Sequence, residues 1–198
     1  MPPSAPPSLR SARIASTAAV FPRLRAALWP EGVGPSHRVY AILDGARDPA
    51  IEEAVKSSGA EYRCLYAGPL PAELAAVAPY LVSLPSDAHW TRTRMRILFE
   101  RTRALTSGVF VTAQEEIETM RRHFRRFLRV RTEDGKTLLF RFYDPRVLRV
   151  YLPTCTDGEL ATVFGPIDEY FYEGEEANTL VAAHRGGTGL KAEVLPLR

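Results

Sequence analysis

The residues that could carry out acid–base chemistry lie where buried strands are expected to end. Asp44 follows the apolar stretch 38–43, and Asp48 comes shortly after it. Arg141 and Asp144 lie in LLFRFYDPRVLRVYL, residues 138–152, which begins with the alternation of a strand and then becomes helical. Sites in α/β proteins form at the carboxyl ends of strands. If the strands are parallel, Asp44, Arg141 and Asp144 can converge into the site of a small enzyme.

The same residues have a structural interpretation, which we favour. Asp48-Pro49 and Asp144-Pro145 are strong helix starts, because Asp accepts a hydrogen bond from a free amide of the first turn and Pro lacks only an amide that would stay unpaired. Arg141 would then form an ion pair with one of the carboxylates. This interpretation explains both stretches without any chemistry, so we expect no enzymatic activity.

An arginine row is the second candidate site. The pattern Thr112-Ala113-Gln114-Glu115 predicts a capped helix start, and the helix that follows would align Arg121, Arg125 and Arg129 on one face. Clustered arginines can bind the phosphates of nucleic acid. However, Glu118 is placed to pair with Arg121, and no exposed aromatic residues are interleaved for base stacking. A solvated face or a protein-contact surface is therefore favoured, with weak nucleic-acid binding as the alternative.

Other classes of site find no support in the sequence. It contains no nucleophile motif, no phosphate-binding glycine loop and no pair of histidines at metal-ligand spacing. The two cysteines, Cys64 and Cys155, are far apart, which is typical of a reducing compartment rather than of a disulfide framework. We therefore expect neither a metal nor a cofactor. The net charge of +3 permits an acidic partner without requiring one.

The elements that must position these residues alternate along the chain. Apolar stretches predict strands, and the amphipathic stretches between them predict helices. The expected strands are 38–43, 62–66, 80–84 and 109–111. Such alternation is typical of an α/β fold with a mixed, largely parallel sheet covered by helices. Asp134-Gly135 predicts an antiparallel hairpin, with residues 138–143 as its return strand.

Composition divides the chain into three parts. Residues 1–18 are rich in Pro and Ser, which predicts a disordered N-terminal arm. Residues 19–167 form the α/β domain, and residues 168–198 supply C-terminal edge strands and a loose tail. The remaining expected elements are helices at 21–29, after Asp87 and at 157–164, and edge strands at 169–172 and 179–184. No stretch has the length of a membrane span or the core of a signal peptide, so we expect a cytoplasmic protein.

Several stretches together resemble a known bacterial family. They occur in the order YAILDGARDP, YRCLYAGPLPAELAAVAPYLVSL, HFRRFLRV, LLFRFYDPRVL and VFGPI, between residues 40 and 167. This pattern is similar to the domain of the effector adaptors, or effector chaperones, of type VI secretion systems. The joint FRFYDPR is the most specific part of the resemblance. The stretch TRTRMRILFER, residues 91–101, departs from the family pattern.

The resemblance implies a non-enzymatic, cytoplasmic protein. Such adaptors bind a toxic effector and help to load it onto the valine–glycine-repeat spike protein. It implies no nucleic-acid partner and no insertion into a membrane. Under this interpretation a structural joint, which could lie beside a partner surface, is formed by Asp44, Arg141, Tyr143, Asp144, Pro145 and Arg146. Our candidate for a partner-binding surface is the row Arg121, Arg125 and Arg129.

Overall fold

The fold is described from a computed structural model, which covers residues 17–86, 107–132 and 134–197. The helices are α1 (Thr17–Leu28), α2 (Ala50–Ser57), α3 (Ala72–Ala76), α7 (Ile117–Arg125), α8 (Pro145–Tyr151) and α9 (Asp157–Phe164), with a 3-10 turn at Leu152–Thr154. The strands of the main sheet are β1 (Arg38–Asp44), β2 (Tyr62–Cys64), β3 (Pro79–Leu84), β4 (Gly108–Ala113), β7 (Ile167–Glu173), β8 (Thr179–Arg185) and β9 (Leu190–Pro196). Strands β5 (Arg129–Arg131) and β6 (Thr137–Leu139) form a separate two-stranded sheet.

Every pairing in the main sheet is antiparallel, so the expected largely parallel sheet is wrong. The strand order is β2-β3-β1-β4-β7-β8-β9. Strand β1 pairs antiparallel with both neighbours, as Ile42 faces Leu81 of β3 and Val109 of β4. Strands β1 and β2 do run in the same direction on either side of α2, but β3 lies between them and pairs with each. The alternation of strands and helices along the chain could not show that β3 would insert between β1 and β2.

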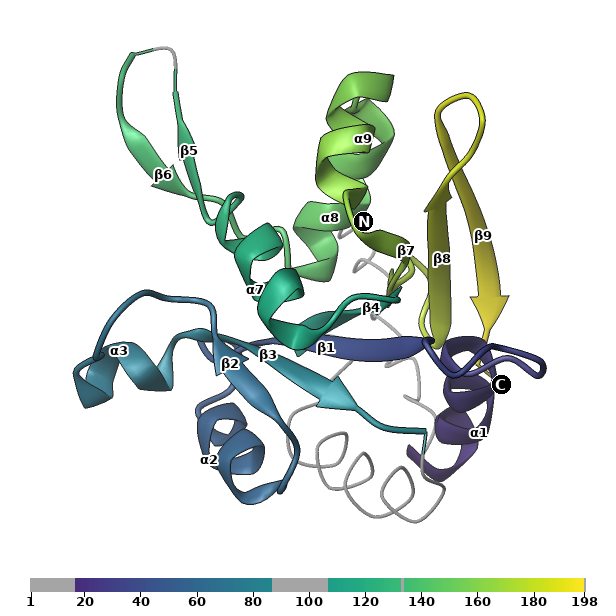
Figure 1. Ribbon diagram of the computed structural model, residues 1–198, viewed down its shortest axis with the longest axis horizontal. Coiled ribbons are helices and arrows are strands. Elements are labelled where there is room, and N and C mark those ends of the chain that lie inside the picture. Colours follow the sequence, from purple (N-terminus) through teal and green to yellow (C-terminus); the bar gives the residue numbers. More distant parts are fainter. Residues whose placement is uncertain (1–16, 87–106, 133, 198) are drawn as a thin grey trace, which may run out of the picture.

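Both faces of the sheet are covered, which explains the continuous apolar runs in its strands. Tyr40 and Ile42 of β1 pack in a core cluster with residues of α7, α8 and α9. Val39 and Leu43 point the other way, into a cluster that includes residues of α1 and α2. Figure 1 shows these helices on opposite sides of the sheet. Continuous apolar strands indicate burial on two faces, and they occur in a covered antiparallel sheet as well as in a parallel one.

The Asp-Pro helix starts were predicted correctly, whereas the start of α7 was not. The Asp144 carboxylate accepts a hydrogen bond from the Arg146 amide at 3.0 Å, and Asp48 accepts one from the Ala50 amide at 2.9 Å. The expected cap at Thr112 is wrong, because Thr112 continues the buried strand β4 and α7 begins at Ile117. A true capping box, with Thr156 and Glu159 as reciprocal partners, begins α9 instead.

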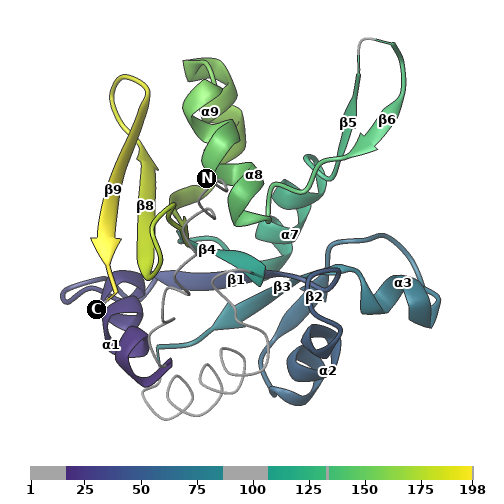
Figure 2. The ribbon, with the colours of Figure 1, turned by 180° about the vertical axis from the view of Figure 1, so that it is seen from behind.

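The hairpin at Asp134-Gly135 is confirmed, but it ends sooner than expected. Strands β5 and β6 pair antiparallel, and Gly135 adopts φ +82 in the turn. Strand β6 ends at Leu139, so residues 140–144 cross from the hairpin to α8 without regular structure. Viewed from behind in Figure 2, the hairpin projects from the body on the same side as α3.

The C-terminal residues extend the same sheet. Strands β7 and β8 pair as expected, with Tyr170 opposite Ala183. The sequence predicted edge strands and a loose tail here, whereas the chain turns back at Gly186–Gly189 and forms β9 along β8. Of the predicted N-terminal arm, residues 1–16 lie outside the described residues, whereas residues 17 and 18 begin α1 and were wrongly assigned to the arm. The helix expected after Asp87 also lies outside the described residues. No helix in the described part of the chain has the length and apolar character needed to cross a membrane.

Candidate functional site

The structure brings together two of the residues expected at strand ends. Asp44 is the last residue of β1, and its buried carboxylate forms an ion pair with the guanidinium of Arg141. Asp44 Oδ1 also accepts a hydrogen bond from the Ala46 amide at 3.1 Å. The charge of the carboxylate is therefore compensated by Arg141, and its position is fixed. This ion pair holds the end of β1 against the segment that leads into α8.

A second arginine neutralises the other carboxylate of the joint. Arg146 Nε donates to Asp144 Oδ1 at 3.0 Å, and its Nη2 donates to Oδ2 at 2.6 Å. Burial would raise the pKa of Asp144, but the hydrogen bonds from Arg146 outweigh it and hold the pKa below the usual value. With the backbone amide of Arg146 the carboxylate has three donors, and a carboxylate with this many donors and a lowered pKa is poorly suited to accept a proton at neutral pH.

The aromatic residues of the joint belong to the core. Phe142 and Tyr143 are both buried, and they lie in a turn before α8 and not in the expected return strand. Phe142 stacks on Phe124 of α7 with ring centroids 5.5 Å apart. Burial, with a smaller contribution from Tyr66, raises the pKa of Tyr143 far above its usual value. Pro145 is also buried and begins α8. The joint thus acts as an anchor for α8.

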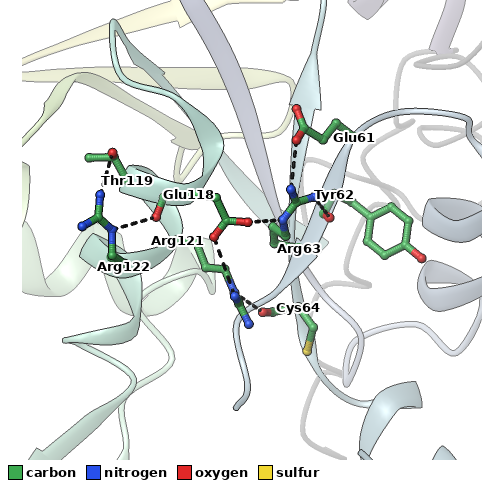
Figure 3. A network of polar contacts seen from close by, with 8 residues as sticks. All are labelled: Glu61, Tyr62, Arg63, Cys64, Glu118, Thr119, Arg121 and Arg122. Atoms are coloured by element: carbon green, nitrogen blue, oxygen red, sulfur yellow. Dashed lines mark hydrogen bonds and ion pairs between the residues drawn. The ribbon is translucent and has the colours of Figure 1, made fainter. Parts of the chain in front are cut away.

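The arginine row is divided between two roles. Arg121 Nε donates to the backbone oxygen of Cys64 at 3.0 Å, and Arg121 also lies 3.7 Å from Glu118. Glu118 forms an ion pair with Arg63 of β2, as Figure 3 shows. Arg121 therefore helps to hold α7 against β2. Its guanidinium is therefore engaged within the protein, whereas the sequence predicted Arg121 as part of a partner-binding row.

The other two members of the row lie beside a groove. Helix α7 ends at Arg125, so Arg129 is on strand β5 and not on the expected helix face. The stretch HFRRFLRV, residues 123–130, contains no glycine or proline that would mark this early end of the helix. Arg125 and Arg129 nevertheless line the same hollow.

We call this hollow the groove. Its volume is about 920 Å³, and it lies between the segment that runs from β2 into α3 and the β5–β6 hairpin. The lining residues are Leu65, Tyr66, Ala67, Pro69, Leu70, Pro71, Leu74, Arg125, Leu128, Arg129, Thr137, Leu138 and Leu139. Figure 1 shows α3 and the hairpin projecting on the same side of the body.

The groove combines exposed leucines with positive charge. Leu74, Leu138 and Leu139 are 49%, 50% and 48% exposed, and they are the only exposed leucines among the described residues. Among the described residues of the lining, only Arg125 and Arg129 are charged. Within the described part of the chain, neither arginine has an ion-pair partner. A gathering of exposed apolar side chains marks an interaction site on a protein surface.

The groove was not predicted from the sequence. Two signals were present. Leu138 and Leu139 are adjacent and both exposed, which breaks the strand alternation, and LYAGPLPAEL places three leucines among turn residues outside any long element. Neither signal indicates that the two stretches meet in space.

Metal and thiol chemistry find no support in the described residues. Within them, no group of three or more His, Cys, Asp or Glu side chains is placed to hold a metal ion. Cys64 and Cys155 are free thiols, and burial raises the pKa of each above its usual value. A raised pKa lowers the fraction of reactive thiolate.

Comparison with known proteins gives one match. A search of curated proteins and a search of solved structures found no match. The family model described as a domain of unknown function, DUF4123, matches residues 39–162. This match spans more than half of the chain, from β1 to most of α9, and it includes the joint and every residue of the groove. The chain therefore belongs to the DUF4123 family.

Proposed function

We propose that this protein is an adaptor that binds a toxic effector and helps to load it onto the valine–glycine-repeat spike of a type VI secretion system. It acts in the cytoplasm and catalyses no reaction. Two lines of reasoning support the proposal. The ordered motifs resemble those of such adaptors, and the family match covers all of these motifs except VFGPI, which begins at residue 163.

The observation that carries the proposal is the groove. Its exposed leucines are costly to leave in water, and its two arginines, which have no ion-pair partner among the described residues, can bind acidic groups of a protein partner. Aromatic residues, methionine and arginine are enriched in protein interfaces, and a central apolar patch with a charged rim is the usual arrangement. Tyr66, Arg125 and Arg129 give the groove this composition.

The two alternative functions have less support. An enzyme that uses Asp44, Arg141 and Asp144 would need a free acid or base, but each carboxylate is paired with an arginine. A nucleic-acid binder would need a continuous row of available arginines, but Arg121 is engaged with Cys64 and Glu118.

Co-purification tests the proposal. The tagged full chain is expressed with the toxin and the spike protein encoded beside its gene, and each is assayed for capture. We expect both to be retained, because a loading factor must contact its cargo and its destination. Capture of neither protein would overturn the proposal. Salt-sensitive binding of nucleic acid by a chain that captures neither protein would favour the alternative.

A further inference from the structure

We infer that the groove binds an amphipathic helix of the protein partner, with large apolar residues on one face and acidic residues at its flank. This inference rests on the proposed adaptor function and specifies the chemistry of what the adaptor holds. The shape, lining and charge of the groove support this one occupant.

The shape of the groove suits an apolar helix face. Leu65 and Leu128 are buried and lie deep in the lining, whereas Leu74 and Leu138, contributed by α3 and the hairpin, are half exposed. An open hollow with apolar sides accommodates residues spaced at i, i+3, i+4 and i+7 on a helix. Sites for small molecules bury most of their ligand, whereas a small ligand in this open hollow would stay largely exposed. The groove is therefore less suited to a small molecule.

A helix fits the backbone chemistry better than an added strand. Strands β5 and β6 have three residues each, so either edge offers only a short ladder to an incoming strand. A helix satisfies its own backbone hydrogen bonds within the segment, so it needs no polar backbone partner from the groove. The partner segment can therefore bury leucines, isoleucines or phenylalanines without leaving unpaired amides.

The charge of the groove selects acidic residues. Arg125 and Arg129 are exposed, and no acidic residue that could compensate their charge is present among the described residues of the lining. Glutamate or aspartate at the flank of the bound helix can form charge-assisted hydrogen bonds with the guanidinium groups. A basic amphipathic helix would place its positive charges next to those of the two arginines. The same arginines therefore also discriminate against basic helices.

Two substitutions in the groove and two matched control substitutions outside it distinguish binding at the groove from binding elsewhere on the molecule. In the groove, the variants are Leu138→Asp and Arg125→Glu. Outside it, Val150→Asp alters a residue of α8 that is 69% exposed, and Arg122→Glu reverses another exposed arginine of α7. All four positions are exposed, so each variant should unfold at nearly the same denaturant concentration as the wild type.

The binding probe is a fluorescein-labelled synthetic peptide with leucines at helical spacing and glutamates on the flanks. A second peptide has lysines in place of the glutamates, and a third has a central proline. Fluorescence anisotropy with the full chain should show binding of the acidic peptide. Leu138→Asp and the lysine peptide should each weaken binding by at least about tenfold, the loss expected for a hot-spot contact. The Arg125→Glu variant should reduce the salt dependence, and both controls should bind as the wild type does.

Each contrary outcome has a defined meaning. The inference is overturned if the acidic peptide fails to bind at millimolar concentration, or if the lysine peptide binds equally well. Equal binding of the proline peptide would indicate that the groove accepts an extended segment, and this result would also overturn the inference. The inference would likewise be overturned if the groove bound an oligonucleotide and did not bind the acidic peptide. If toxin and spike co-purify with Leu138→Asp as with the wild type, the groove inference fails and the adaptor stands. If the peptide binds but neither protein co-purifies, the adaptor proposal fails instead.

Discussion

The carboxylate of Asp44 and the guanidinium of Arg141 form an ion pair between residues that are 97 positions apart in the chain. Asp44 ends β1, and Arg141 lies in the segment before α8. The Asp44 side chain is only 1% exposed, whereas that of Arg141 is 35% exposed. The pair therefore attaches α8 and its aromatic neighbours to the sheet, and the buried carboxylate depends on it.

Removal of the arginine should destabilise the fold. We expect Arg141→Met to lower the free energy of unfolding by about 1–3 kcal/mol, the usual cost of leaving a buried polar group without its partner. Urea denaturation measures this change, with the exposed Arg122→Met as the control. In the double variant with Asp44→Asn the loss should be less than additive, because the uncompensated charge is then absent. Strictly additive losses would show that the two residues do not stabilise each other.

The charge of Asp144 should make stability depend on pH. Asparagine is also a good N-cap, so Asp144→Asn removes mainly the charge, whereas Asp144→Ala also removes the cap and should cost about 0.5–2 kcal/mol. Because the pKa of Asp144 lies below its usual 3.8 in the folded state, the unfolded chain binds more protons as pH falls. The advantage of wild type over Asp144→Asn should be complete above pH 3.8 and decline as pH falls below it. Thermal unfolding across this range tests the prediction, and a constant difference would contradict it.

The end of α9 requires a glycine. Gly165 adopts φ +48, and a Cβ there would lie 2.4 Å from Cε1 of His123. His123 is itself buried, with Nε2 at 2.9 Å from the backbone oxygen of Val163. We expect Gly165→Ala to cost at least about 1–3 kcal/mol, because strained backbone and overlap with a buried ring act together.

Gly158 provides the matched control for Gly165. It lies in the same helix, and a Cβ there would meet no atom within 4 Å. Gly158→Ala should therefore raise the free energy of unfolding by about 0.4–1 kcal/mol. Chemical denaturation of both variants measures the two changes in the free energy of unfolding. Equal effects at the two positions would mean that the contact with His123 is not what constrains the helix end.

The hairpin should be open to change without loss of the main fold. Gly135 adopts φ +82 in its turn, so Gly135→Val should disturb the β5–β6 pairing. Since these strands form a sheet of their own, the midpoint of global unfolding should change little. Hydrogen exchange should increase within residues 129–139 alone, and binding of the acidic peptide should weaken. A cooperative loss of stability throughout the chain would contradict the prediction.

The sequence was informative where a single stretch determines the structure. The apolar runs placed β1, β3 and β4 almost correctly, and Asp-Pro identified the starts of α2 and α8. Asp134-Gly135 identified the hairpin. In each case the signal is local, because a cap, a tight turn or a run of buried side chains depends on residues that are close along the chain.

Relationships between distant stretches could not be predicted in the same way. The insertion of β3 between β1 and β2 is decided by pairing partners, and apolar runs are the same in either arrangement. The pairing of Arg141 with a carboxylate was expected, but the groove was not. Its two sides come from residues 65–74 and 125–139, and they meet only because of how the hairpin leaves the body.

The pairing of β7 with β4 has a practical consequence for any fragment of this chain. The family match ends at residue 162, before β7 begins, yet β7 covers the free side of β4, whose residues are all buried. A fragment cut at that boundary would present a long apolar strand edge to other molecules, and such edges promote aggregation. The full chain instead ends its sheet with β9, where Lys191 and Glu193 are exposed and discourage further pairing. The limits of the shared sequence are therefore narrower than the limits of the sheet.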